Sequence, residues 1–520
     1  MFAWAALAVG LGVMIGLASV VLPPTGAFGI VAVAGLVLLW AIPDLPVFPM
    51  RTVRKLFFVA LVTDVAVPVY YAIDIPSLPW ISLHRVVAAV LIICFAFGVA
   101  ASSTVRNEIL DRLKYSPALS VCAVGFLAML FLSILTSHDL VSSLSGLVDV
   151  ILEWYVPFFV AIYVIRTYPD VLLMVRVLVI CSLVIGVIGV WEFHEQRRIL
   201  FDIFPASVLD AFLAQNPYFE GMLTPEFRNG MYRAASVFVT SNSYGEFSAM
   251  IFPLGLFFTF HGQSRLDRLL GPWISVFAFV SVVLSGARVG FLGMLLAAPV
   301  FTLLWIVRQY RVGKGDMKPA FVALIMAMGF ALLFAAVLFW PRARIYVMGD
   351  GMAAYSTQSR YDQWSLGWPH ILENPITGHG FENSGSVIGW GNGDGKFSVD
   401  SYPLTLLVEC GVPGFVFFTG MVLLPIWYGI RDYVTDLTPQ GALRGALACS
   451  VLAYGASRLF LSVRENHMLF LTIVAATIAL NYAYAMKRGP KGAEVRSRHL
   501  ERRRPALPKV ARSAGRGSPA

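Results

Sequence analysis

Long apolar runs separated by short polar segments dominate the sequence. A membrane-spanning helix needs about 20 predominantly apolar residues. Within hydrocarbon each run has to be helical, because only then does the backbone satisfy its own hydrogen bonds. We therefore expect an all-α polytopic integral membrane protein with about 14 transmembrane helices (12–14) and a large, partly helical outer loop. The apolar runs lie at residues 3–22, 27–42, 56–73, 83–102, 117–137, 150–166, 170–192, 244–261, 270–286, 287–307, 319–340, 403–428, 443–461 and 467–486.

Charge and cysteine content exclude several other classes of protein. Only 13% of the residues are charged, against about 25% in a soluble domain. The five cysteines are scattered over apolar segments, which argues against a disulfide framework or a zinc site. Residues 487–520 hold eleven Lys/Arg and two Glu, which accounts for the whole net charge of +9. We expect a disordered basic tail there, and no nucleic-acid partner, because no folded reader accompanies it.

The distribution of Lys and Arg predicts the orientation. With a cytoplasmic N-terminus, 26 of the 39 basic residues fall in short inner loops or in the tail. Both termini are then cytoplasmic, and both long loops face outward. The predicted organisation is a set of transmembrane helices over 1–340 with an outer loop at 193–243, a large periplasmic or extracellular loop at 341–402, C-terminal transmembrane helices over 403–486, and the cytoplasmic tail at 487–520.

Several arginines run against this orientation, because they lie at the outer side. Interfacial snorkelling explains such a residue, as does pairing with an acidic side chain. For a set that converges on one face, a site for an anionic ligand is the better interpretation. The arginines at or near outer helix ends or in the outer loop are Arg85, Arg233, Arg288, Arg360, Arg458 and Arg464, and the acidic candidates for pairing are Glu192, Glu226 and Glu465.

Three polar segments face this outer side. The segment 233–246 contains Asn242, a possible helix cap, and Glu246, which needs a partner inside an apolar run. The segment 285–290 reads Ser-Gly-Ala-Arg-Val-Gly and allows a tight turn that holds Arg288 at the surface.

The third segment, 341–414, is the longest polar interruption. Residues 356–371 have the spacing of an amphipathic helix, which Asn374-Pro375 ends. Gly378 and Gly380 then allow a close turn. Asp400 stands before the next apolar run, either as a helix N-cap or as a carboxylate available for general-base catalysis.

In this membrane setting, the order and spacing of these segments resemble the O-antigen ligase and O-antigen polymerase superfamily. The resemblance covers about residues 230–430. It implies a metal-independent glycosyltransferase without a cofactor, in the bacterial inner membrane. Such proteins take a glycan from an undecaprenyl-diphosphate carrier at the outer face and pass it to a lipid-A core or to another repeat unit. The matching segments are Arg233 to Asn242, Ser-Gly-Ala-Arg at 285–288, Arg360 with Trp364, Glu-Asn-Pro-Ile-Thr-Gly-His-Gly-Phe at 373–381, and Asp400 to Gly414.

The resemblance also suggests roles for individual residues. Arginines suit a diphosphate leaving group, because their forked donors match phosphate oxygens; Arg233, Arg288 and Arg360 are the candidates. Ligases of this superfamily carry a His shortly before the helix that closes the loop, whereas residues 398–402 read Ser-Val-Asp-Ser-Tyr. This departure favours a polymerase-like enzyme. The candidates for the base are Asp400, then His379, and after them Glu382 and Asp394.

The expected partners are a polyprenyl-diphosphate-linked oligosaccharide, a glycan or lipid acceptor, membrane lipids and other polysaccharide assembly proteins. A transporter or flippase of a lipid-linked glycan, or of another anionic substrate, is the alternative. The scarcity of charged residues in the middle of the apolar runs argues against that alternative.

Overall fold

The computed structural model describes most of the chain. The predicted spans 3–22 and 27–42, residue Asp394 and the tail beyond 488 lie outside the described residues. The described residues are 44, 48–73, 81–203, 205–215, 224–228, 230–313, 317–339, 352–391 and 399–488.

Helices form nearly all of the described structure, as predicted, and the four short strands make two hairpins, β1–β2 and β3–β4. Eight helical segments within the described residues are long and apolar enough to cross a membrane. The number fourteen is not confirmed. The elements are α3 (Met50–Ala66), β1 (Ala72–Ile73), β2 (Ile81–Ser82), α4 (Leu83–Ala101), α5 (Ser103–Lys114), α6 (Pro117–Ser133), η1 (Ile134–Thr136), α7 (Leu140–Asp149), η2 (Val150–Tyr155), α8 (Val156–Val164), α9 (Tyr168–Glu195), η3 (Ile199–Asp202), α10 (Ala206–Gln215), β3 (Phe227–Arg228), β4 (Met231–Tyr232), α12 (Ser241–His261), α13 (Arg265–Ser285), α14 (Arg288–Val312), α15 (Lys318–Phe339), α17 (Met352–Glu373), α18 (Ser384–Ile388), α19 (Tyr402–Thr435), α20 (Pro439–Arg458) and α21 (His467–Arg488).

Two predicted boundaries were wrong for identifiable reasons. The run 56–73 was placed too late, because α3 begins at Met50 with polar residues in its first turn. The run 150–166 is only the second half of a segment that begins at Leu140, where the Asp139 side chain accepts hydrogen bonds from the Val141 and Ser142 N–H groups. A π-helical turn, η2, joins α7 to α8 within this segment.

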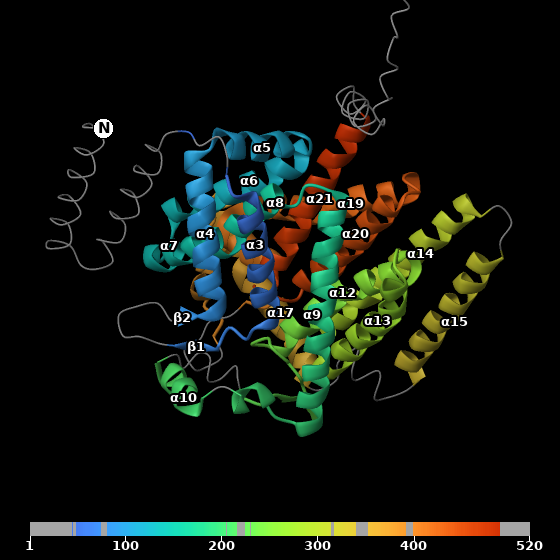
Figure 1. Ribbon diagram of the computed structural model, residues 1–520. Helices are drawn as coiled ribbons and strands as arrows, with labels where there is room; N and C mark the ends of the chain where they lie inside the picture. Colours follow the sequence, from blue (N-terminus) through green and yellow to red (C-terminus); the bar gives the residue numbers. More distant parts are fainter. Residues whose placement is uncertain are drawn as a thin grey trace, which may run out of the picture.

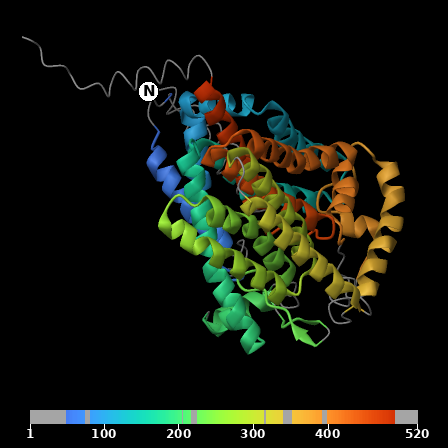
Figure 2. The same ribbon diagram turned by 90° about the vertical axis from the view of Figure 1, so that its right-hand side faces the viewer.

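The two ends of the helix bundle carry different elements (Figure 1). The helix α5 lies at one end, and α10 lies at the other. The view in Figure 2 shows the same separation, with the β3–β4 hairpin near α10. We call the end with α10 and this hairpin the cavity end. Arg233 and Arg288, near or at the starts of α12 and α14, both lie at this end.

Two buried glutamates inside the bundle have polar partners. The Arg458 guanidinium and the Glu246 carboxylate form an ion pair, with 2.9 Å between Nε and Oε1. Asn466 donates a further hydrogen bond to Glu246 Oε2 at 2.9 Å. Glu246 therefore has the partner that its apolar surroundings require. Glu192 is also buried, and it accepts hydrogen bonds from the Tyr232 hydroxyl and the Ala235 N–H.

The segment predicted as the large outer loop is largely helical where it is described. The amphipathic helix expected over 356–371 is confirmed as α17, which ends at Glu373 directly before Asn374-Pro375. Trp364 and Ile371 of α17 pack in one apolar cluster with Leu404 and Val408 of α19. This packing fixes the loop against the membrane-spanning part and so determines where Arg360 lies.

Candidate active site

A cavity of about 770 Å³ opens at the cavity end. Its lining comes from the β3–β4 hairpin, from the starts of α12 and α14, from α17 and α18, and from the loop 459–466 that joins α20 to α21. The structure brings four of the five predicted site residues to this cavity, namely Arg233, Arg288, Arg360 and Asp400. The volume lies within the usual range for a small-molecule site.

Arg233 is held firmly in place. Its Nη2 donates to Asn242 Oδ1 at 2.8 Å, its Nε donates to the Ser285 carbonyl at 3.0 Å, and its Nη1 pairs with Glu226. Gly286 lies beside it with φ +58°, and a Cβ there would lie 3.1 Å from Arg233 Cγ. Asn242 therefore positions Arg233 and does not cap α12, whose N-cap is Thr240. The cap interpretation of Asn242 was wrong.

Three further arginines, Arg228, Arg288 and Arg360, differ from Arg233 in their contacts. Within the described residues none of the three has an acidic side chain in ion-pair contact, although all three line the cavity. The Arg360 Nε is buried without a hydrogen-bond partner in that part of the chain. The Arg360 guanidinium lies over the Phe460 ring, 5.4 Å from its centroid. Such a group of arginines is the arrangement that an anionic ligand would complete.

Sequence reasoning missed Arg228. It lies in the short β3–β4 hairpin, away from any predicted helix end. Pairing of Phe227 with Tyr232 and of Arg228 with Met231 sets the hairpin beside Arg233. The signal that could have found it is its position in the predicted outer loop 193–243, where basic residues would oppose the topological bias.

Asp400 supplies a carboxylate to the same cavity. Its backbone N–H donates to Gln363 Oε1 of α17 at 2.9 Å, which connects it to the helix that carries Arg360. Ser401, and not Asp400, is the N-cap of α19. The cap interpretation of Asp400 was therefore wrong. Burial raises the pKa of the Asp400 carboxyl above its usual range, although the nearby Arg360 opposes this shift.

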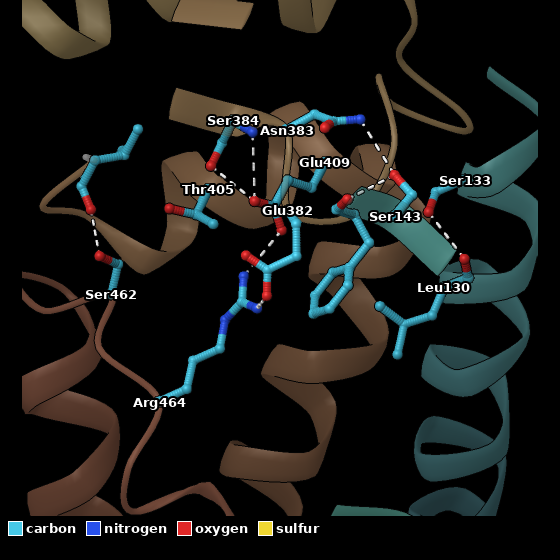
Figure 3. A network of polar contacts seen from close by, with 12 residues as sticks. Leu130, Ser133, Ser143, Glu382, Asn383, Ser384, Thr405, Glu409, Ser462 and Arg464 are labelled. Carbon is cyan, nitrogen blue, oxygen red and sulfur yellow. Dashed lines mark hydrogen bonds and ion pairs between the residues drawn. The ribbon is translucent and has the colours of Figure 1, made fainter. Parts of the chain in front are cut away.

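One wall of the cavity is formed by a second polar network (Figure 3). The Arg464 guanidinium pairs with Glu382 and lies 3.3 Å from Glu409 Oε2. Ser384 Oγ donates to Glu409 Oε1 at 2.7 Å. Burial alone would lower the pKa of Arg464, but the carboxylates of Glu382 and Glu409 outweigh it and raise that pKa. The network therefore keeps Arg464 charged and fixes Glu382 at the cavity.

A break in α19 builds this wall. Gly411 has φ 67° and interrupts the helical backbone. The turn 375–380 fits into the break: the N–H groups of His379 and Gly380 donate to the carbonyls of Val408 and Glu409, and Val412 N–H donates to Pro375 O. A Cβ on Gly411 would lie 2.5 Å from the Ile376 carbonyl oxygen. The predicted close turn at Gly378 and Gly380 is confirmed, since both have positive φ.

His379 lies in this turn and does not line the cavity. Its Nε2 donates to the His370 carbonyl oxygen at 2.8 Å. The ligand atoms of His370, Glu373 and His379 all lie within 4.8 Å of one another, so this group is where a metal ion could be held in the described part of the chain. Glu382, the third candidate for the base, does line the cavity.

Comparison with known proteins bears on the central and C-terminal part of the chain. A search of curated proteins finds no match. Residues 273–419 match the family model described as O-antigen ligase. The matched stretch includes Arg288, Arg360 and Asp400, whereas Arg233 precedes it. The match suggests a membrane enzyme of the glycan ligase or polymerase type, and it confirms the predicted resemblance to the O-antigen ligase superfamily for this part of the chain.

Proposed function

We propose that this protein is a membrane glycosyltransferase that transfers or polymerises undecaprenyl-diphosphate-linked glycan at the outer face of the bacterial cytoplasmic membrane. The observation that carries the proposal is the cavity that Arg228, Arg288 and Arg360 share with Asp400. The proposal also includes metal-independent chemistry and cytoplasmic termini.

The arginines would bind the diphosphate of the carrier-linked donor. Negative charge gathers on the diphosphate as the glycosidic bond breaks, and fixed guanidinium donors stabilise that charge. Arg288 and Arg360 are the better candidates for direct contact, because the Arg233 guanidinium already has three protein partners. Arg233 would then act chiefly by holding the 285–288 turn, since it donates to the Ser285 carbonyl.

The reaction is a substitution at the anomeric carbon of the donor sugar. The acceptor hydroxyl oxygen forms the new bond to that carbon, and the carbon–oxygen bond to the diphosphate breaks with its electron pair. Undecaprenyl diphosphate leaves, and Asp400 takes the hydroxyl proton. The raised pKa of Asp400 makes it a stronger base than an exposed aspartate. The position of Asp400 at the cavity, where His379 does not reach, favours Asp400 for this role.

The acceptor is proposed to be a second carrier-linked repeat unit and not a lipid-A core. This part of the proposal rests on the sequence, because residues 398–402 contain no His. Membrane lipids and other polysaccharide assembly proteins are its further proposed partners.

The test is complementation of a deletion strain with variants of the protein. Arg288→Ala removes one phosphate contact, worth about 1.5–3 kcal/mol, and should reduce the rate of polymer formation roughly 10- to 150-fold at normal protein levels. The matched control is Arg265→Ala, at the start of α13 on the opposite end of the bundle, where the side chain is exposed. Full-length polymer at the wild-type rate in Arg288→Ala would refute the proposed binding of the diphosphate by Arg288. Transport of carrier-linked glycan across vesicle membranes without elongation would favour the flippase alternative.

A further inference from the structure

A second cavity, of about 340 Å³, lies beside the first at the cavity end. The two cavities share Glu382, Val463 and Arg464 in their linings. The rest of the second lining comes from the end of α3, the start of α4, the middle of the 140–164 segment and the segment 237–240 that leads into α12. Glu382 and Arg464 therefore stand between two adjoining spaces.

The two cavities differ in their balance of charged side chains. Five arginines and five carboxylates line the first, whereas five carboxylates and two arginines line the second. Both of these arginines have acidic neighbours: Arg85 lies 3.9 Å from Glu153, and Arg464 contacts Glu382 and Glu409. A diphosphate would find fewer cationic partners in such a lining than in the first cavity. The carboxylates that line the second cavity are Asp64, Asp149, Glu153, Glu382 and Glu465.

The second cavity has the chemistry of a site for an uncharged sugar. Carboxyl groups offer hydrogen-bond acceptors in either protonation state, and sugar hydroxyls can donate to them. Within the described residues, Asp64 and Asp149 have no hydrogen-bond donor and no ion-pair partner, so their oxygens are available to a ligand. Trp154, Phe238 and Val65 add apolar surface to the lining, against which the C–H face of a sugar ring can pack.

Several contacts hold the boundary between the cavities. Glu382 has φ 68°, a left-handed conformation that is unusual for a residue other than glycine. The Arg464 guanidinium lies over the Phe381 ring at 4.3 Å from its centroid and over the Trp154 ring at 5.9 Å. Backbone strain of this kind persists where the surroundings over-determine the conformation, and it concentrates at functional sites. The Glu382 carboxylate is thus held where the contents of the two cavities would meet.

We infer that the second cavity is the acceptor subsite, which binds the uncharged, hydroxyl-rich end of a glycan and presents one hydroxyl past Glu382 and Arg464 to the donor in the first cavity. This inference rests on the proposed function, because it assigns the acceptor to a space next to the donor diphosphate. It also assigns Glu382 as a positioning residue at the junction.

Equilibrium binding to the purified full chain tests the inference. The probes are phosphate-free, uncharged oligosaccharides, released by mild acid from the source organism's own surface polysaccharide, and inorganic pyrophosphate. Combined Asp149→Asn and Glu153→Gln should weaken oligosaccharide binding at least tenfold and leave pyrophosphate binding unchanged. The matched control is Asp111→Asn in α5, an exposed acidic residue remote from both cavities. If the double variant fails to fold, Asp64→Asn in α3 makes the same test from another helix.

Arg288→Ala should give the opposite pattern, with pyrophosphate binding lost and oligosaccharide binding kept. Oligosaccharide affinity that is absent in the wild type, or unchanged in both acidic variants, would overturn the acceptor subsite. Pyrophosphate binding that survives Arg288→Ala would instead contradict the proposed donor site. The failure of the inference and the failure of the proposed function are therefore distinguishable.

Discussion

The buried pair of Glu246 and Arg458 gives the sharpest prediction about stability. It joins the first turns of α12 to the end of α20, and the loop 459–466 that follows α20 lines the first cavity. The Glu246 and Arg458 side chains are only 1% and 3% exposed. Glu246→Gln keeps the shape of the side chain and removes its charge, so the Arg458 guanidinium is left buried without a counter-charge.

The expected cost follows from this geometry. Breaking a buried ion pair by neutralising one partner costs about 3–5 kcal/mol, since the remaining charge stays desolvated. The Tyr454 ring, 4.9 Å from the Arg458 guanidinium carbon, can offset only part of that cost. Arg458→Met should cost a similar amount, because it leaves the Glu246 carboxylate buried. The double variant should be less destabilised than the sum of the two single variants, by about 2 kcal/mol or more.

The assay is a double-mutant cycle of unfolding free energies, measured by SDS titration of the purified protein in mixed micelles. Asp432 and Arg444 form a second buried pair near the other end of α20, and the same cycle on that pair serves as a comparison. If the two single-variant costs add to within about 0.5 kcal/mol, the pair is not coupled, and our account of how Glu246 is accommodated is refuted.

Two further predictions concern the site and the turn at residues 375–380. Asp400→Asn should slow glycan transfer by about 10²–10⁴-fold. The wild-type rate should fall as the pH drops through the raised pKa of Asp400, because a general base must be deprotonated. If the rate of Asp400→Asn falls at low pH in the same way, the titrating group is not Asp400. Gly411→Ala should destabilise the protein by more than about 1 kcal/mol, because Gly411 has a positive φ and the new Cβ would lie 2.5 Å from the Ile376 carbonyl oxygen. The matched control is Gly329→Ala, where a Cβ meets nothing within 4 Å. Equal thermal stability of the two variants would contradict the fit of the 375–380 turn against α19.

The sequence alone determined the class of fold and identified four of the residues that line the cavity. Long apolar runs with few charges can only be membrane helices, since the backbone has to bond to itself in lipid. The arginines that oppose the topological bias were visible for the same reason, and Arg233, Arg288 and Arg360 do lie at one cavity. Local signals such as Asn374-Pro375 and Gly378 also predicted the end of α17 and the close turn after it.

Only the tertiary structure decided what each of these residues contacts. Asn242 looked like a helix cap but holds Arg233. Arg308, one of the 26 basic residues assigned to the predicted inner loops and tail, donates to the carbonyls of Tyr433, Asp436 and Thr438. These contacts join residues that are far apart in the sequence, and the hydropathy pattern does not predict such contacts.

The same holds for the two cavities and the boundary between them. Arg464 meets Glu382 across 82 positions of the chain, because the break at Gly411 lets the 375–380 turn dock against α19 and carry Glu382 to the loop 459–466. The sequence predicted which charges stand at the outer side of the membrane. The packing of the helices, which depends on side-chain shape and on pairs distant in sequence, decided which of them are neutralised by partners and which line a cavity.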